Sequence, residues 1–198
     1  MPSGRRRGLV ITVSGLHGSG TSTQARRLAE ALGLRYVSAG HLFRRIAEER
    51  GLTLEELSRL AEEDPELDRM IDERTREEAR RGGVVIDATL AGWMAEDADL
   101  KIFLTAPLEE RVRRIARREG LSLEEARRET LKRERSERER FKRYYGIDID
   151  DLSIYDVVLN TALFKPDATA RILRGIVEEL QRGRKHRSDN HRQINAKP

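Results

Sequence analysis

The stretch SGLHGSGTSTQ (Ser14–Gln24) stands between two segments of different character. The residues before it, LVITVSG (Leu9–Gly15), form an apolar and β-branched run that is typical of a strand buried on both faces. After it, apolar residues recur at helical spacing from Ala25 to Leu32. The stretch is therefore predicted to be a tight, glycine-rich turn from a strand into a helix.

A turn of this kind can bind phosphate, because successive backbone N–H groups point into one concavity and the helix N-terminus adds its dipole. Gly15, Gly18 and Gly20 permit the tight path. The stretch matches the pattern G-x-x-x-x-G-K-[ST] at every position but one, because Thr21 stands where the pattern has lysine. Ser22 stands where the loop hydroxyl binds Mg²⁺. The alternative is a plain turn without a ligand.

Four further short strands are predicted, with helical patterns between them. They are Arg35–Gly40, Val84–Thr89, Leu100–Ala106 and Asp156–Ala162. Strands that alternate with helices favour an α/β fold with a parallel sheet and right-handed crossovers. Two helices carry capping-box spacing, Thr53 with Glu56 and Ser122 with Glu125, and prolines at 65, 107 and 166 suit first helical turns.

Composition restricts the function classes. The 198 residues include no cysteine, which excludes disulfides, thiolate metal sites and cysteine catalysis. The four histidines show no metal-ligand spacing. No apolar run approaches the roughly 18 residues of a membrane span, and no signal-peptide segment is found, so we expect a cytoplasmic protein. Heavy use of Arg and Glu fits a protein from a hot environment.

Positive charge is concentrated in three regions. Residues 1–8 form a basic extension, 107–143 hold 14 basic and 9 acidic residues, and 182–198 hold 6 basic and 1 acidic. The last region has one aliphatic residue and no periodicity, so we expect a disordered tail. Because it has no interleaved aromatic residues, it predicts non-specific attraction to nucleic acid and no specific RNA site. We expect a monomer.

The segment KRERSERER (Lys132–Arg140) contains no apolar residue, so it is predicted to project into solvent. It has two interpretations. It is a solvated helix held by pairs such as Glu129 with Arg133 and Glu134 with Arg138, or its arginines supply the charge that Thr21 lacks.

Polar residues also follow the ends of two predicted strands. Ser38 and Gly40 end the second strand, and Arg44, one helical turn later, can hold a monophosphate bidentately. The alternative is that Arg44 is an ordinary surface arginine, which would give the same sequence pattern. Asp87 ends the VVIDAT strand, where a carboxylate can bind Mg²⁺ or a metal-bound water, or can cap a helix.

With these residues in view, the chain resembles the nucleoside monophosphate kinases, and among them the archaeal type of cytidylate kinase. The resemblance runs from about Leu9 to about Leu180. The segments that carry it besides the loop are AEEDPELDRMIDER, LAGWM, ADLKIFLTAPLEERVRRIARREG and SERERFKRYYGIDIDDLSIYDVVLNT.

The resemblance implies a P-loop three-layer sandwich with a five-stranded parallel sheet, over residues 9–181, and a helical lid at about 120–143. It implies transfer of the ATP γ-phosphoryl group to CMP, with dCMP as a further candidate acceptor, assisted by Mg²⁺. By this resemblance Arg44 holds the acceptor phosphate, and Arg133 and Arg140 of the lid stabilise the transferring group. The donor phosphates lie on Gly15, Leu16, His17, Gly18, Ser19, Gly20, Thr21, Ser22 and Thr23.

Three positions depart from the family pattern. Thr21 replaces the usual lysine, His41 stands in place of an aspartate, and Thr89 replaces an arginine expected to touch the bound monophosphate. Two alternatives follow. The acceptor is a different monophosphate, or the chain is a nucleotide-binding relative that has lost catalysis.

Overall fold

Five parallel strands form one sheet in the computed structural model, which describes residues 8–194. The strands are β1 (Val10–Gly15), β2 (Arg35–Ser38), β3 (Val84–Asp87), β4 (Leu100–Thr105) and β5 (Val157–Asn160), in the spatial order β2-β3-β1-β4-β5. All four pairings are parallel. The five predicted strands are thus confirmed, although the structure ends β2, β3 and β5 two residues earlier than the patterns indicate.

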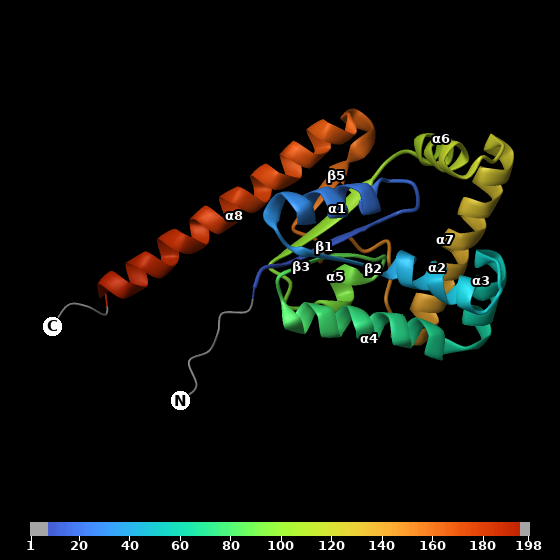
Figure 1. Ribbon diagram of the computed structural model, residues 1–198, viewed down its shortest axis with the longest axis horizontal. Helices are drawn as coiled ribbons and strands as arrows, with labels where there is room; N and C mark the ends of the chain where they lie inside the picture. The colour runs from blue at the N-terminus through green and yellow to red at the C-terminus, as the bar shows by residue number, and fades with distance from the viewer. Residues whose placement is uncertain (1–7, 195–198) are drawn as a thin grey trace.

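Helices cover both faces of the sheet, which gives three layers (Figure 1). On one face α1 (Thr21–Leu32) and α8 (Pro166–Ile194) pack on Ile11, Val13 and Ile102. On the other face α4 (Pro65–Arg81) and α5 (Ala91–Met94) cover Val10 and the alternate residues of β3. All residues of the inner strand β3, and most residues of β1 and β4, are buried because the parallel sheet has helices on both sides, whereas the edge strands β2 and β5 are partly exposed. The predicted three-layer α/β sandwich is therefore confirmed.

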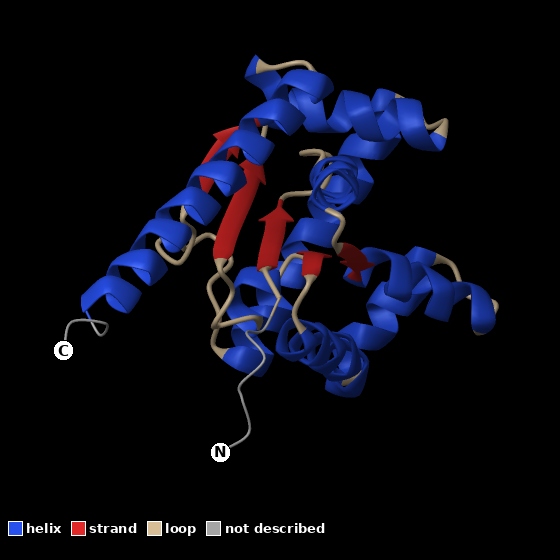
Figure 2. Cartoon of the chain, turned by 60° about the vertical axis from the view of Figure 1, so that its left-hand side comes forward, coloured by secondary structure: helices blue, strands red, loops and turns tan. Residues whose placement is uncertain are grey.

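The remaining helices lie beyond one end of the sandwich, as Figures 1 and 2 show. They are α2 (Ala39–Glu49), α3 (Leu54–Glu63), α6 (Leu108–Glu119) and α7 (Leu123–Tyr145), and the 3₁₀ turn η1 (Thr161–Leu163) follows β5. Because β1, β2 and β3 end on this side, the loops after them face these helices. None of the described helices is long and apolar enough to cross a membrane.

The predicted helix starts are largely confirmed. Thr53 begins α3 and Ser122 begins α7 with complete capping boxes, and Pro65 is the first residue of α4. Pro166 likewise opens α8, whereas Pro107 stands one position earlier, as the N-cap of α6. Each local signal therefore marks its helix boundary to within one residue.

The expectation of a disordered tail after Gln181 is wrong for residues 182–194, because α8 continues to Ile194. The first half of α8 packs on the sheet through Leu173 and Val177 and so supplies the helix nucleus. Extending an existing helix costs little, and the segment is rich in Arg, Lys and Gln and lacks proline. The segment therefore needs no core of its own. Residues 1–7 and 195–198 of the two predicted termini lie outside the described residues.

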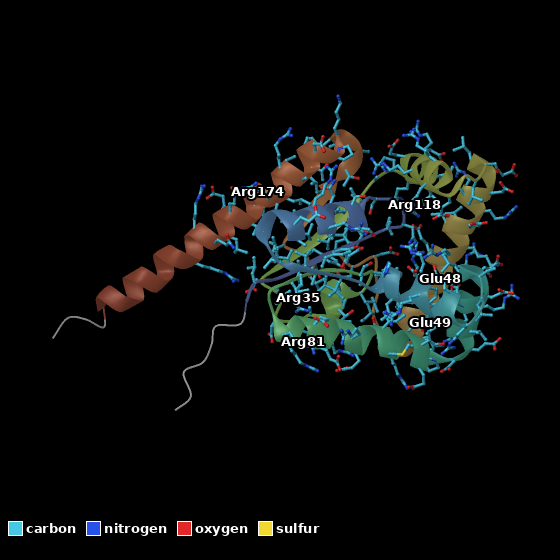
Figure 3. The ribbon with its side chains drawn as sticks, in the orientation of Figure 1. Arg35, Glu48, Glu49, Arg81, Arg118 and Arg174 are labelled. Carbon is cyan, nitrogen blue, oxygen red and sulfur yellow. The ribbon has the colours of Figure 1, made fainter. Side chains whose placement is uncertain are left out.

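A buried carboxylate joins α4 to the edge strand β2 at the far end of the sheet. The Glu78 side chain is about 1% exposed and pairs with Arg35, with Arg74 at 2.7 Å and with Arg81 at 3.1 Å. Figure 3 labels Arg35 and Arg81 at this end, well away from Arg118 on α6. Glu78 therefore holds the beginning of β2 against α4.

Glu78→Gln is expected to lower the free energy of unfolding by about 2–3 kcal/mol, because it leaves arginines around a neutral buried group. The neighbouring Glu77→Gln is the control. Glu77 is 51% exposed and contacts only Arg74, at 3.3 Å, so its substitution should change stability by less than about 0.5 kcal/mol. Urea unfolding of both variants measures the difference, and equal losses would contradict the role of Glu78.

Candidate active site

The loop between β1 and α1 has the backbone of a phosphate-binding turn. Gly18 and Gly20 have φ of 81° and 95°, a region that favours glycine. Gly20 is the N-cap of α1 and no side chain caps the helix, whose first turn contains no acidic residue. The N–H groups at the start of α1 therefore remain available to an anion, together with the positive end of the helix dipole.

Helix α6 holds this loop from behind through its carbonyl groups. Arg111 Nη1 donates to the His17 carbonyl at 3.0 Å, and Arg114 Nη1 donates to the Gly18 carbonyl at 3.4 Å. Thr161 Oγ1 donates to the Ser19 carbonyl at 2.7 Å. These hydrogen bonds fix the path of the loop against α6 and η1.

One pocket brings most of the predicted site residues together. Those that line it are Gly15, Leu16, His17, Gly18, Thr21, Ser22, Gly40, Arg44, Asp87, Thr89, Arg133 and Arg140. They come from the glycine-rich loop, α1, α2, the end of β3 and α7. Segments more than 100 residues apart in the chain thus meet at the carboxyl ends of the strands, where ligands of open α/β sheets bind.

Four predicted site residues do not line this pocket. Ser19 is fully buried within the loop, Gly20 caps α1, and Thr23 is exposed. Ser38 is the N-cap of α2, where its hydroxyl accepts a hydrogen bond from the His41 backbone N–H at 3.3 Å.

Asp87 is a buried carboxylate at the floor of the pocket. Its Oδ2 accepts hydrogen bonds from Tyr36 at 2.9 Å and from Ser38 at 3.1 Å, and the residue is 6% exposed. The helix-cap interpretation of Asp87 is wrong, since the next helix, α5, begins after Leu90 without a side-chain cap. Its two hydrogen bonds fix the orientation of the carboxylate toward the pocket.

The prediction that Lys132–Arg140 projects into solvent is wrong for three of its residues, because Glu134, Ser136 and Arg140 are buried. Glu134 pairs with Arg111 of α6. Arg138 pairs with Asp150, so the predicted Glu134–Arg138 pair does not form. The helix has no apolar face here, but partners on other elements neutralise its charges, which a sequence pattern does not reveal.

Helix α7 also contacts the glycine-rich loop. Glu137 Oε1 lies 3.0 Å from His17 Nε2. Burial alone would raise the pKa of Glu137, but the adjacent His17, followed by Arg133 and Arg140, lowers it to about 2. Glu137 therefore stays ionised and holds α7 against the loop.

Four guanidinium groups line the pocket, those of Arg44, Arg118, Arg133 and Arg140. Sequence reasoning missed Arg118, and also the supporting Arg111 and Arg114. Their spacing of three and four residues places them on one face of α6, and that spacing was the available signal. This positive charge suits a ligand with several phosphates.

Sequence reasoning also missed two aspartates of α4 that line the pocket, Asp68 and Asp72. They are 5% and 6% exposed. Burial raises the pKa of each to about 6, from an ordinary 3.8; the nearby Arg140 opposes the shift of Asp68, and the charge of Asp68 adds to the shift of Asp72. The available signal was their position on the same helix face as the buried Leu67 and Ile71.

Asp72→Asn is expected to stabilise the protein at about pH 8 by up to about 3 kcal/mol and to change little at about pH 4. The folded-state pKa is raised, so the contribution of this carboxyl group to stability is complete below about pH 4. This contribution is lost as the pH rises through about 6. The other groups that act on Asp72, which are Arg76, Arg140, Tyr145 and Asp68, are unchanged by the substitution. Urea unfolding at both pH values tests this.

Asp150→Asn is the control for that measurement, since the hydrogen bond from Arg138 lowers the pKa of Asp150. Its stability effect should have the opposite sign at about pH 8. A gain for Asp72→Asn that is equal at both pH values would contradict the assigned pKa shift.

The chain matches the Cytidylate kinase-like family over residues 10–163. It is 49% identical to cytidylate kinase of Pyrococcus horikoshii over 87% of this chain and 90% of that protein. It is 53% identical to cytidylate kinase of Ignicoccus hospitalis over 83% of this chain and 96% of that protein.

Two solved structures share the fold at low identity. A gluconokinase from Sinorhizobium meliloti has a TM-score of 0.61 at 17% identity, over 93% of this chain and 99% of that one. Shikimate kinase from Bacteroides thetaiotaomicron has a TM-score of 0.58 at 16% identity, over 86% and 98%. The fold is thus that of the P-loop kinases. The sequence identity with the two archaeal cytidylate kinases then decides the family within this fold. The chain belongs to the cytidylate kinase-like family.

Proposed function

We propose that this protein transfers the γ-phosphoryl group of ATP to CMP, forming ADP and CDP. The observation that supports it best is one pocket in which a phosphate-binding loop, Arg44 and the α7 arginines Arg133 and Arg140 face one another. The relatives that share about half of its residues are named cytidylate kinases. The same site accommodates dCMP as a further candidate acceptor.

The donor phosphates bind at the glycine-rich loop. The N–H groups at the start of α1 and the helix dipole attract the phosphate oxygens. Thr21 offers a hydroxyl donor but no charge, so guanidinium groups supply the missing cation. Arg118 approaches from α6, and Arg133 and Arg140 approach from α7.

The acceptor phosphate binds at Arg44, whose planar guanidinium matches two phosphate oxygens. An oxygen of this phosphate attacks the γ-phosphorus, and the bond from that phosphorus to the oxygen of the leaving ADP breaks. The attacking oxygen is already anionic near neutral pH, so the transfer requires no general base. Catalysis is then positioning and charge neutralisation, to which Arg133 and Arg140 contribute most in the transition state.

Ser22 and Asp87 are the residues that would hold Mg²⁺ with the donor nucleotide. Both line the pocket, and Asp87 is oriented by Tyr36 and Ser38. One carboxylate and one hydroxyl fit Mg²⁺, which keeps several waters and takes its other ligands from phosphates. Bound there, the ion neutralises charge on the phosphates. The described residues contain no group of three or more acidic or histidine side chains that could hold a metal without substrate.

Arg133→Ala and Arg140→Ala are expected to lower kcat for CDP formation from ATP and CMP by about a hundredfold or more, because each removes charge stabilisation of the transferring group. A coupled assay of diphosphate formation with CMP, dCMP, UMP, AMP and GMP measures this. The control is Arg138→Ala on the same helix, whose partner Asp150 lies outside the pocket. Turnover of another acceptor in preference to CMP, or of none, would overturn the assignment.

Gly18→Ala is expected to abolish ATP binding. An added Cβ would lie 2.7 Å from the Arg111 carbonyl oxygen, and the φ of 81° is itself strained for alanine. Gly20→Ala has a similar φ but open space around the new methyl group, so it should bind ATP more weakly without losing it. Calorimetric titration with ATP separates the two, and equal affinities would contradict this packing of the loop on α6.

The monomeric state and the non-specific attraction of the basic termini to nucleic acid stay predictions.

A further inference from the structure

One contact joins the glycine-rich loop directly to α7. His17 Nε2 lies 3.0 Å from Glu137 Oε1, and the two side chains are 21% and 15% exposed. Because an ionised carboxylate only accepts hydrogen bonds, His17 is the donor. Among the hydrogen bonds and ion pairs of the residues that the structure describes, no other joins loop residues 15–20 to α7 without an intermediate residue.

Helix α7 is also attached to the rest of the protein by two stronger contacts. Glu134 pairs with Arg111 of α6, and both residues are buried. Arg140 lies 3.1 Å from Asp68 of α4, and both of these are buried as well. The contact with the loop is therefore not the main attachment of α7, and its place in the pocket indicates a second role.

The contact lies in a stretch of α7 that faces the pocket. Arg133 stands one turn before Glu137, and both line the pocket together with His17. The guanidinium of Arg133 forms no hydrogen bond or ion pair with any described residue, whereas Arg140 is paired with Asp68. No partner side chain fixes Arg133, so its place relative to the loop depends on how this turn of α7 is held.

The charge of Glu137 is unfavourable in a pocket for phosphates. Burial raises the pKa of Glu137, but His17, followed by Arg133 and Arg140, lowers it to about 2, so the group is an anion. An anion at this place repels the phosphate groups of a donor nucleotide and weakens their binding. The cost is explained if the carboxylate orders the groups that act on those phosphates.

We propose that His17 and Glu137 are positioning residues, whose contact sets the place of Arg133 relative to the donor phosphates on the loop. This rests on the proposed function, in which Arg133 stabilises the transferring phosphoryl group. The two side chains act through Arg133 and not on the reacting atoms. Because that stabilisation belongs to the transition state, loss of the contact lowers kcat without lowering ATP affinity.

The test separates the contact from the charge. Glu137→Ala removes both, whereas Glu137→Gln removes the charge but keeps an oxygen that accepts from His17. We expect kcat for CDP formation to fall by about tenfold in Glu137→Ala and by less than about threefold in Glu137→Gln. ATP affinity, measured by calorimetry, should stay or rise in both, because a negative charge leaves the pocket.

Glu139→Ala is the matched control, since Glu139 is exposed on the same helix and its loss changes the net charge equally. It should leave kcat and ATP affinity unchanged. Equal values of kcat in Glu137→Ala and Glu139→Ala would overturn the proposal. A fall in ATP affinity as large as the fall in kcat would overturn it too, because it would show a general loss of the pocket.

Two double variants test whether the effect passes through the assigned partners. His17→Ala combined with Glu137→Ala should lower kcat no more than the more damaging single substitution does. Arg133→Ala should cost several-fold less in kcat when Glu137 is already alanine, because the guanidinium is then already misplaced. Additive losses in either pair would overturn the proposal.

Hydrogen exchange of the free proteins gives a readout that needs no turnover. The backbone amides of residues 15–20 should exchange faster in Glu137→Ala than in the wild type, and Glu139→Ala should match the wild type. Equal exchange in all three would overturn the role of the contact. If exchange follows this expectation but the wild type makes no CDP, the proposed reaction fails while the ordering of the loop by α7 stands.

Discussion

The side chain of Arg111 is the contact on which the site depends. It is buried, and it donates through Nε to the Ala106 carbonyl at 3.1 Å and through Nη1 to the His17 carbonyl at 3.0 Å. The same guanidinium pairs with Glu134 of α7. One residue thus connects the end of β4, the glycine-rich loop and α7. Removing one partner of such a buried pair typically costs about 3–5 kcal/mol.

Arg111 and Arg114 hold the glycine-rich loop through its carbonyl groups. Arg111 donates to the His17 carbonyl and Arg114 to the Gly18 carbonyl, so the path of the loop depends on α6 as well as on its own glycines. The guanidinium groups that line the pocket come from helices and not from the loop, with Arg44 on α2, Arg118 on α6, and Arg133 and Arg140 on α7. The positive charge of the pocket therefore depends on how α6 and α7 pack.

The acidic residues of α4 show two different uses of a buried carboxylate. Glu78 is surrounded by arginines and stabilises the junction of α4 with β2. Asp68 pairs with Arg140 alone, at 3.1 Å, and burial raises the pKa values of Asp68 and Asp72 to about 6. A carboxyl group whose pKa is raised by burial destabilises the folded protein once the pH exceeds that pKa. The number of arginines around a buried carboxylate thus decides its effect on stability.

The sequence by itself determined the five strands, the turn at Ser14–Gln24 and the caps at Thr53 and Ser122. These follow from local periodicity and spacing, because the residues that fix a strand or a capping box are close together in the chain. The family followed from the resemblance of longer segments to known sequences. The sequence also predicted that Arg44, Asp87, Arg133 and Arg140 belong together, and the pocket confirms that they meet.

Only the tertiary structure decided which polar residues are buried and with what partners. Lys132–Arg140 has the pattern of a solvated helix, yet Glu134 and Arg140 are buried because their partners come from α6 and from α4. Charge pairing between distant elements leaves no period in the sequence. Asp68 and Asp72 escaped notice for the same reason, since an aspartate on an apolar helix face is interpretable only once the opposite wall of the pocket is known.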